Sequence, residues 1–147
     1  MPRSMEEVSA LYYALLDAWN RHDAVAYAAL FADDGYVVGF DGSEMKGRHE
    51  IEQSLGAIFA DHETGRYVGK ARAERIVASD VAMLGAVAGL VPAGKSELNP
   101  QLNAIQTLVA KREDGGWRIL QFQNTPAQFH GRPDDAEALT NELRALA

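Results

Sequence analysis

The chain has 147 residues and no cysteine, with 14 basic and 21 acidic residues and a formal net charge of −7 at pH 7. This length is typical of one domain that buries a core of its own. The negative charge disfavours nucleic acids and anionic membranes as partners, because clustered basic residues bind such polyanions. The lack of cysteine excludes disulfides and thiolate chemistry, and the start of the chain has no apolar signal core. We therefore expect a cytoplasmic protein.

The first part of the chain is predicted to be mainly helical. Apolar residues recur at helical spacing over 4–22, and Asp23 is of the residue type that caps a second helix, over 24–32. The β-branched and aromatic residues of 36–40 predict a strand, and 47–62 has the apolar face of a third helix. Helices therefore precede most of the predicted strands.

The second part is predicted to be rich in strands. Alternating and apolar patterns predict strands over 66–78, 81–91, 102–112 and 117–125. Gly115-Gly116 predicts a hairpin turn between the last two strands, and a short acidic helix is predicted after Pro133. Helices followed by an antiparallel meander indicate an α+β fold, which we take as a single domain over 1–147 with a core of about 5–126 and a tail over 127–147.

The strand predicted over 81–91, "VAMLGAVAGLV", is apolar on both faces. One face of an antiparallel sheet is often exposed to water, so a strand without polar positions needs cover on its second face. Another chain or the C-terminal tail could provide this cover.

Metal and cofactor sites are not expected. The four histidines are scattered, and no pair has the i, i+4 spacing of a helical metal site. No glycine-rich phosphate loop follows a first strand, which disfavours a nucleotide redox cofactor.

Pairing across the predicted hairpin assigns side chains to the two faces of the sheet. If Lys111 lies opposite Trp117, one face carries Trp117, Ile119, Gln121 and Gln123. The opposite face then carries Ala104, Gln106, Leu108, Leu120, Phe122 and Asn124. A β-bulge would exchange these sets locally.

Three stretches, "AWNRHDAVAYAALFADDGYVV", "GRHEI" and "GGWRILQFQNT", resemble the NTF2-like superfamily in their order and spacing. Within it they resemble the SnoaL-like and DUF4440 branch, and most of all the SgcJ/EcaC-type small proteins encoded in enediyne antibiotic clusters. This resemblance implies a cone, in which a curved antiparallel sheet wraps the N-terminal helices around an internal pocket. It also implies dimerisation through the outer face of the sheet.

The resemblance implies which face lines the pocket. In cyclising SnoaL-type members the catalytic acid lies on the last strand, at the position that aligns with Asn124. Gln106, Phe122 and Asn124 are then expected in the pocket, and Trp117, Ile119, Gln121 and Gln123 at a dimer interface. The aspartate base and oxyanion tyrosine of the ketosteroid isomerase branch align with Gly39 and Leu15, so that proton shuttle is not expected here.

Other candidate residues each allow a structural and a functional interpretation. Asp41 could act as a base, or simply turn the chain at Asp41-Gly42. Trp19, Phe40 and Phe59, like Phe122, could line an aromatic pocket or fill the core. Tyr13 could offer its hydroxyl to the cavity or lie across the surface. Buried amides at Gln106 and Asn124 need partners, which backbone, water or a ligand could supply.

The resemblance, together with the amides expected in the pocket, implies a small protein of enediyne or polyketide antibiotic biosynthesis that binds an apolar intermediate, for instance a polyene, in its pocket. It would be an accessory binding protein, or a cyclase, isomerase or hydratase that needs no cofactor. The alternative is a non-catalytic module for sequestration, for docking on a biosynthetic enzyme or for oligomerisation. The expected assembly is a homodimer.

Overall fold

The computed structural model describes the backbone of residues 2–147 and the side chains of residues 5–147. The helices are α1 (Pro2–Asn20), α2 (Ala24–Ala29), α3 (Arg48–Asp61), the short 3-10 helix η1 (Pro100–Leu102) and α4 (Pro133–Arg144). The strands are β1 (Phe31–Val38), β2 (Glu44–Lys46), β3 (Arg66–Ala78), β4 (Val81–Val91), β5 (Ala104–Glu113) and β6 (Gly116–Pro126). The α+β prediction is confirmed.

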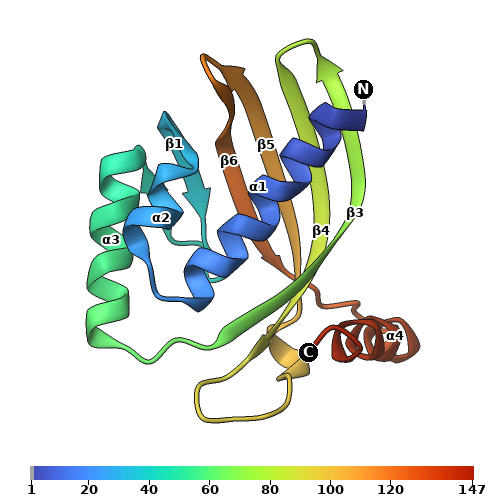
Figure 1. Cartoon of the computed structure of the whole chain (residues 1–147). Helices are drawn as coiled ribbons and strands as arrows, with labels where there is room; N and C mark the ends of the chain where they lie inside the picture. Colours follow the sequence, from blue (N-terminus) through green and yellow to red (C-terminus); the bar gives the residue numbers. More distant parts are fainter. Residues whose placement is uncertain (1) are drawn as a thin grey trace.

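The strands form one curved sheet in the order β2-β1-β6-β5-β4-β3, and α1, α2 and α3 cover one face of it (Figure 1). We call this the inner face and the opposite one the outer face. The meander predicted after residue 66 is antiparallel, as the pairing of β3 with β4, β4 with β5 and β5 with β6 shows. The antiparallel sheet that the resemblance implied is a mixed sheet instead, because β1 pairs parallel to β6. The inner face and the helices share an apolar core in which Tyr12, Leu15 and Phe31 are fully buried.

The second helix is shorter than predicted, and the first strand begins earlier. Asp23 does cap α2, because its Oδ1 accepts a hydrogen bond of 2.9 Å from the backbone N–H of Ala26. The helix ends at Ala29, and Phe31 already belongs to β1. The guanidinium of Arg48 donates two hydrogen bonds, of 2.9 and 2.7 Å, to the carbonyl oxygen of Phe31 and so ties α3 to the start of this strand.

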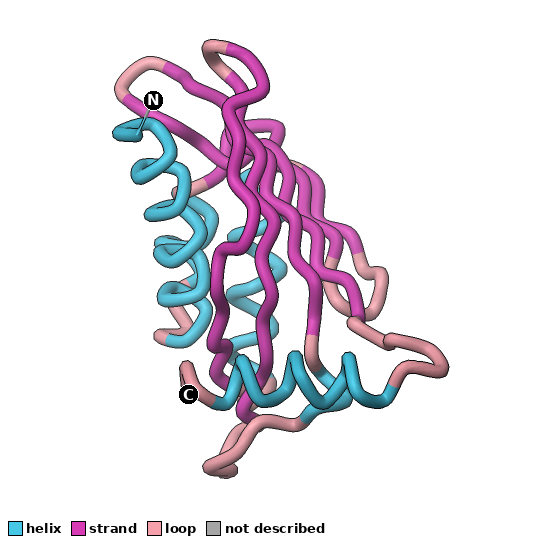
Figure 2. The backbone as a smooth tube through the Cα atoms, turned by 90° about the vertical axis from the view of Figure 1, so that its right-hand side faces the viewer, coloured by secondary structure: helices cyan, strands magenta, loops and turns pink. Residues whose placement is uncertain are grey.

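Helix α4 covers part of the outer face, as one of the two interpretations of the apolar strand 81–91 requires. Leu139 and Leu143 of α4 pack on Val68 of β3 and Val87 of β4 in a second apolar cluster. Glu142 of α4 also forms ion pairs with basic residues of β3. Figure 2 shows α4 running across the end of the sheet. The C-terminal tail therefore supplies cover at this end of β4.

The predicted pairing of the last hairpin is wrong on both sides of a bulge in β6, since Lys111 pairs with Arg118 near the turn and Thr107 pairs with Gln123 beyond the bulge. Val109 lies opposite Gln121 and Ala110 lies opposite Ile119, so Leu120 is the extra residue. The bulge moves the residues that precede it to the other face. Trp117 and Ile119, predicted on the outer face, are instead buried in the core on the inner face.

The residues after the bulge lie on the predicted faces. Gln106 pairs directly with Asn124, and Leu108 pairs with Phe122, all on the inner face. Gln123 is exposed and Gln121 half-buried on the outer face. Of the four residues predicted at an interface, only the two glutamines therefore remain on an outward surface.

Candidate functional site

A cavity of about 400 Å³ lies between the helices and the inner face of the sheet. Its walls come from α1, α2, α3, β3, β5, β6 and the segment from the end of β1 into β2. The lining residues are Leu15, Leu16, Trp19, Tyr27, Val37, Gly39, Phe40, Asp41, Ser43, Glu44, Met45, Ser54, Leu55, Ile58, Tyr67, Gln106, Phe122 and Asn124. Most of these side chains are apolar, which suits a ligand with a largely hydrocarbon surface.

Trp19 fixes one wall of the cavity. Its indole Nε1 donates a hydrogen bond of 3.0 Å to the carbonyl oxygen of Gly65. Its ring meets the ring of Tyr67 edge-on, with centroids 5.5 Å apart, and that of Phe59 with centroids 5.2 Å apart. Phe59 supports Trp19 and is not among the residues that line the cavity.

A chain of four polar side chains forms one end of the cavity. The Tyr12 hydroxyl donates a hydrogen bond of 2.7 Å to Oε1 of Gln106. Nε2 of Gln106 donates to Oδ1 of Asn124 over 3.2 Å, and Nδ2 of Asn124 donates to the hydroxyl of Tyr67 over 3.1 Å. The chain therefore runs from the buried core to the cavity wall, and each amide uses its oxygen and one N–H within it.

Neighbouring residues position both ends of this chain. The Asn20 side chain binds the backbone of Tyr67 twice, accepting from its N–H over 2.8 Å and donating to its carbonyl over 2.9 Å. At the other end, Tyr12 lies so close to β3 that a Cβ at Gly69 would come within 2.2 Å of its hydroxyl oxygen. The absence of a side chain at Gly69 therefore makes room for Tyr12.

Tyr12 and Tyr67, the two tyrosines in this row of hydrogen bonds, are held in their neutral form. Burial, together with neighbouring Tyr13 and Tyr67, raises the pKa of Tyr12 well above its usual value. Burial also raises the pKa of Tyr67, although the hydrogen bond from Asn124 acts in the opposite direction. At neutral pH each hydroxyl therefore keeps its proton and can donate one hydrogen bond.

Asp41 lies at the mouth of the cavity. Its Oδ1 accepts a hydrogen bond of 2.9 Å from the backbone N–H of Ser43, within the turn that leads to β2. Hydrogen bonds from Ser43 hold the pKa of Asp41 below its ordinary value. The turn interpretation of Asp41 is confirmed, and a lowered pKa makes this carboxylate a weaker proton acceptor at neutral pH.

Most of the predicted pocket residues come together. Asn124, Gln106, Phe122, Trp19 and Phe40 all line the cavity, and so does Asp41. The prediction is wrong for Phe59 and for Tyr13. Tyr13 is 46% exposed, and its hydroxyl accepts a hydrogen bond from the N–H of Ala71 over 3.1 Å.

Sequence reasoning missed Tyr12 and Tyr67 as partners of the amides. Tyr67 shares the inward-facing side of β3 with Gly69 and Ala71, in the period-two pattern of a strand. That alternation was a usable signal. The contact between Tyr12 and Gln106 spans 94 positions of the sequence, and no local pattern could indicate it.

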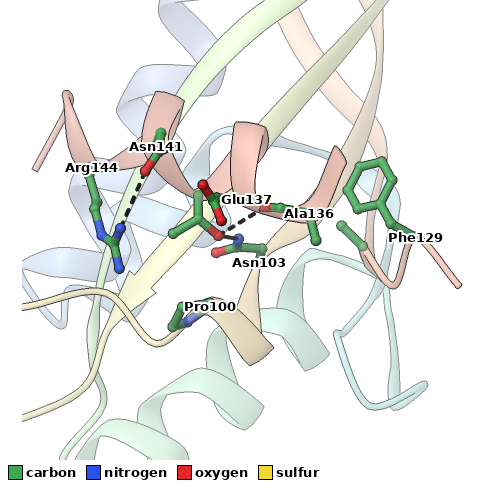
Figure 3. Close-up of a pocket in the computed structure, with 9 residues that line it drawn as sticks. Pro100, Asn103, Phe129, Ala136, Glu137, Asn141 and Arg144 are labelled. Carbon is green, nitrogen blue, oxygen red and sulfur yellow. Dashed lines mark hydrogen bonds between the residues drawn. The ribbon is translucent and has the colours of Figure 1, made fainter. Parts of the chain in front are cut away.

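A second hollow, of about 510 Å³, lies between α4 and η1 (Figure 3). Within it, Nδ2 of Asn103 donates to the hydroxyl of Thr140 over 2.9 Å, and that hydroxyl donates to the carbonyl of Ala136 over 3.1 Å. These bonds fasten α4 to the start of β5. The hollow is more open than the cavity and has a smaller apolar surface, so we assign the candidate site to the cavity.

Neither a metal-binding cluster nor a membrane-spanning helix is found among the described residues. Among the residues that the structure describes, no group of three or more histidine, aspartate or glutamate side chains is arranged to hold a metal ion. None of the helices within residues 2–147 combines the length and apolar character needed to cross a bilayer.

The chain belongs to the family of SnoaL-like domains, whose model matches residues 8–127. No curated protein matches it. Among solved structures it is similar to a domain of unknown function with a cystatin-like fold from Nostoc punctiforme. The two are 26% identical with a TM-score of 0.83, and the match covers 97% of this chain and 90% of that one.

Two more distant structures share the fold. A ketosteroid isomerase-like protein from Erwinia carotovora atroseptica is 16% identical with a TM-score of 0.69, over 87% of this chain and 99% of that one. An NTF2-like protein of unknown function from Shewanella oneidensis is 19% identical with a TM-score of 0.68, over 85% and 99%. The NTF2-like fold prediction is thereby confirmed.

Proposed function

We propose that this protein binds a small, mainly apolar molecule in the cavity, with an oxygen-bearing end of the molecule at the side chains of Tyr67, Gln106 and Asn124. The observation that carries this proposal is the asymmetry of the cavity. Its walls are mainly aliphatic and aromatic, while one end is made of hydrogen-bonding side chains. A ligand with one polar end would satisfy both parts at once.

The arrangement favours binding or positioning over proton transfer. Among the described residues, the only carboxylates that line the cavity are Asp41, between β1 and β2, and Glu44, the first residue of β2. Asn124 holds an amide where SnoaL-type cyclases carry an acid, and an amide stays neutral near pH 7 and does not act as a general acid or base. If the protein is a cyclase, isomerase or hydratase, it acts by holding its substrate in a reactive conformation.

The narrower role in an enediyne or polyketide pathway, with an apolar intermediate as ligand, rests on the sequence resemblance and belongs to this proposal. The alternative is a module that sequesters a product or docks on a biosynthetic enzyme without turnover. Product profiles of the pathway measured with and without the protein separate the two. A profile that Asn124→Ala and Gln106→Ala change as fully as the wild type does would contradict the site assignment, and tight binding without conversion would support the module.

The cavity itself is tested with the neutral fluorescent dye phenylnaphthylamine. Ser54 of α3 lines the cavity, and Ser54→Trp would place an indole in it. We expect the wild type to enhance the fluorescence of the dye and Ser54→Trp to lose at least tenfold in affinity, because the ring occupies the binding volume. Ala57→Trp is the matched control, since Ala57 is an exposed residue on the same helix. Equal affinities for all three proteins would contradict the proposal.

For assembly, we propose a homodimer in which a second copy covers the outer face of β5 and β6 beyond α4. Supporting it are the 38% exposed side chain of Ile105 and the uncharged side chains of Thr107, Gln121 and Gln123 around it. Sedimentation velocity should give twice the mass of the chain for the wild type and a monomer for Ile105→Lys. A monomeric wild type at micromolar concentration would overturn this proposal.

A further inference from the structure

The chain of hydrogen bonds at the polar end of the cavity has a defined direction. Tyr12 is fully buried and stays protonated, so its hydroxyl needs an acceptor. Oε1 of Gln106 is that acceptor, which turns the amide nitrogen of Gln106 toward Asn124. The same logic turns Oδ1 of Asn124 toward Gln106 and its nitrogen toward Tyr67.

The opposite direction is disfavoured by the burial of Tyr12. If both amides were reversed, Tyr67 would donate to Asn124, and the hydroxyl of Tyr12 would accept from Gln106. The proton of Tyr12 would then lack an acceptor in the core, at a cost of about 1–3 kcal/mol. The buried end of the chain therefore sets the orientation at the cavity end.

Tyr67 carries the one hydroxyl in this row of hydrogen bonds whose proton is not used within it. The hydroxyl oxygen of Tyr67 accepts from Asn124, so its own proton is not used in the chain. Within residues 5–147, no protein acceptor takes a hydrogen bond from this hydroxyl. Tyr67 lines the cavity, and the proton is available to whatever occupies it.

We propose that Tyr67 is the hydrogen-bond donor that recognises a neutral carbonyl oxygen of the ligand, and that Asn124, Gln106 and Tyr12 are positioning residues that orient its hydroxyl. This inference rests on the proposed binding function and assigns the polar contact to a residue outside the amide pair. The bond from Asn124 polarises the Tyr67 hydroxyl, because a hydroxyl that accepts a hydrogen bond is a stronger donor.

Charge in the cavity selects the kind of oxygen. Among the described residues, no lysine or arginine lines it, whereas Asp41 and Glu44 lie at its mouth. A carboxylate or phosphate on the ligand would have to leave water without a positive partner and pass two acidic side chains. A ketone, aldehyde or ester carbonyl accepts one hydrogen bond without this cost. We therefore assign the ligand to the class of apolar carbonyl compounds.

The test compares two probes of nearly the same shape, methyl naphthyl ketone and ethylnaphthalene, which lacks the oxygen. Isothermal titration should show that Tyr67→Phe weakens binding of the ketone about fivefold, the ratio that a hydrogen bond of about 1 kcal/mol gives. Binding of ethylnaphthalene should change less than about twofold, because the ring of residue 67 remains.

Infrared spectroscopy of the bound ketone gives a readout that a structural role would not move. The carbonyl stretch should lie at a lower wavenumber in the wild type than in Tyr67→Phe, where it should approach its position in an apolar solvent. Asn124→Leu keeps the Tyr67 hydroxyl but removes its donor, and an intermediate position is expected. Tyr13→Phe is the matched control, since its hydroxyl lies outside the cavity, and it should leave the stretch unchanged.

The outcomes separate this inference from the binding function beneath it. If neither probe binds the wild type, both proposals are overturned. If both probes bind and Tyr67→Phe changes neither the ketone affinity nor the carbonyl stretch, the cavity function stands and the role of Tyr67 is overturned. A stretch that is the same in Asn124→Leu as in the wild type would overturn the positioning role of Asn124. Circular dichroism confirms that each variant is folded.

Discussion

Two pairs of amides on neighbouring strands show how differently the two faces of the sheet use the same chemistry. Gln106 and Asn124 face inward, are almost fully buried, and bond to each other and to two tyrosines. Gln121 and Gln123 face outward on β6, with one contact of 3.5 Å between their side chains. Bulk water can replace that outer contact, whereas the inner bonds are shielded from bulk water because Gln106 is 1% and Asn124 9% exposed.

The difference shows that burial, and not residue type, decides how much an amide contributes to the free energy of unfolding. A buried polar group without a partner costs about 1–3 kcal/mol, so the inner amides must be satisfied as a set. An exposed amide exchanges protein partners for water at little cost. A substitution on the inner face should therefore deprive several polar groups of their partners, while a substitution on the outer face should affect only the substituted residue and its immediate neighbour.

The largest expected effect is that of Gln106→Leu. The leucine fills a similar volume but leaves the Tyr12 hydroxyl and Oδ1 of Asn124 without their partners. We expect the free energy of unfolding to fall by about 3 kcal/mol. Gln123→Leu is the matched change on the outer face and should alter it by less than about 0.5 kcal/mol. Urea unfolding measures both, and equal effects would contradict the comparison.

A smaller loss is expected from Gly69→Ala. The added Cβ would lie 2.2 Å from the Tyr12 hydroxyl and 2.6 Å from Cδ1 of Leu16, so the inner face must shift. Overpacking of this kind costs about 2 kcal/mol. The control is Gly85→Ala on β4, where the nearest atom to the new Cβ is 3.8 Å away.

Combining Gly69→Ala with Tyr12→Phe tests whether the Tyr12 hydroxyl limits the packing at position 69. In the Tyr12→Phe background the hydroxyl is absent, and Gly69→Ala should cost less than it does alone. The contact with Leu16 remains in both backgrounds, so the relief should be partial. Strict additivity of the two changes in thermal unfolding would show that the hydroxyl does not limit the packing there.

The buried tyrosines should make stability fall at high pH. Burial raises the pKa of Tyr12 and of Tyr27 above the value of about 10 that tyrosine has in an unfolded chain. Their stabilising contribution is complete below pH 10 and is lost as the pH rises above it, because only the unfolded state then releases the proton.

Each such tyrosine should lower the free energy of unfolding by about 1.4 kcal/mol per pH unit above pH 10. Urea unfolding at several values between pH 10 and 11.5 measures the slope. Tyr12→Phe should reduce this slope by the contribution of one proton, about 1.4 kcal/mol per pH unit. A slope that is the same in wild type and Tyr12→Phe would show that Tyr12 ionises freely in the folded protein.

The elements that the sequence predicts well are those whose pattern is local. Helix α1 shows a long apolar periodicity, and Asp23 is an explicit cap, so both were found. The inward placement of Gln106, Phe122 and Asn124 was also predictable, since these residues lie beyond the bulge. The resemblance to known relatives chose which face is the inner one.

The elements that were missed depend on contacts between distant segments. The bulge at Leu120 has no glycine or proline to mark it, and it moves Trp117 and Ile119 into the core, where large apolar side chains gain most from burial. The parallel pairing of β1 with β6 joins residues as distant in sequence as Phe31 and Ile119. The contact between Tyr12 and Gln106 likewise depends on the completed sheet.

The smallest expected effect comes from Tyr13, the sequence neighbour of Tyr12. Both hydroxyls bond to the protein, but Tyr12 lies in the core and Tyr13 is 46% exposed. Tyr13→Phe frees the N–H of Ala71 to bond with water, so we expect a loss of about 0.5 kcal/mol or less. Tyr12→Phe leaves Oε1 of Gln106 buried without its donor and should cost about 2 kcal/mol. Equal losses in urea unfolding would mean that water reaches Gln106, and the direction inferred for the hydrogen-bond chain would then lose its physical basis.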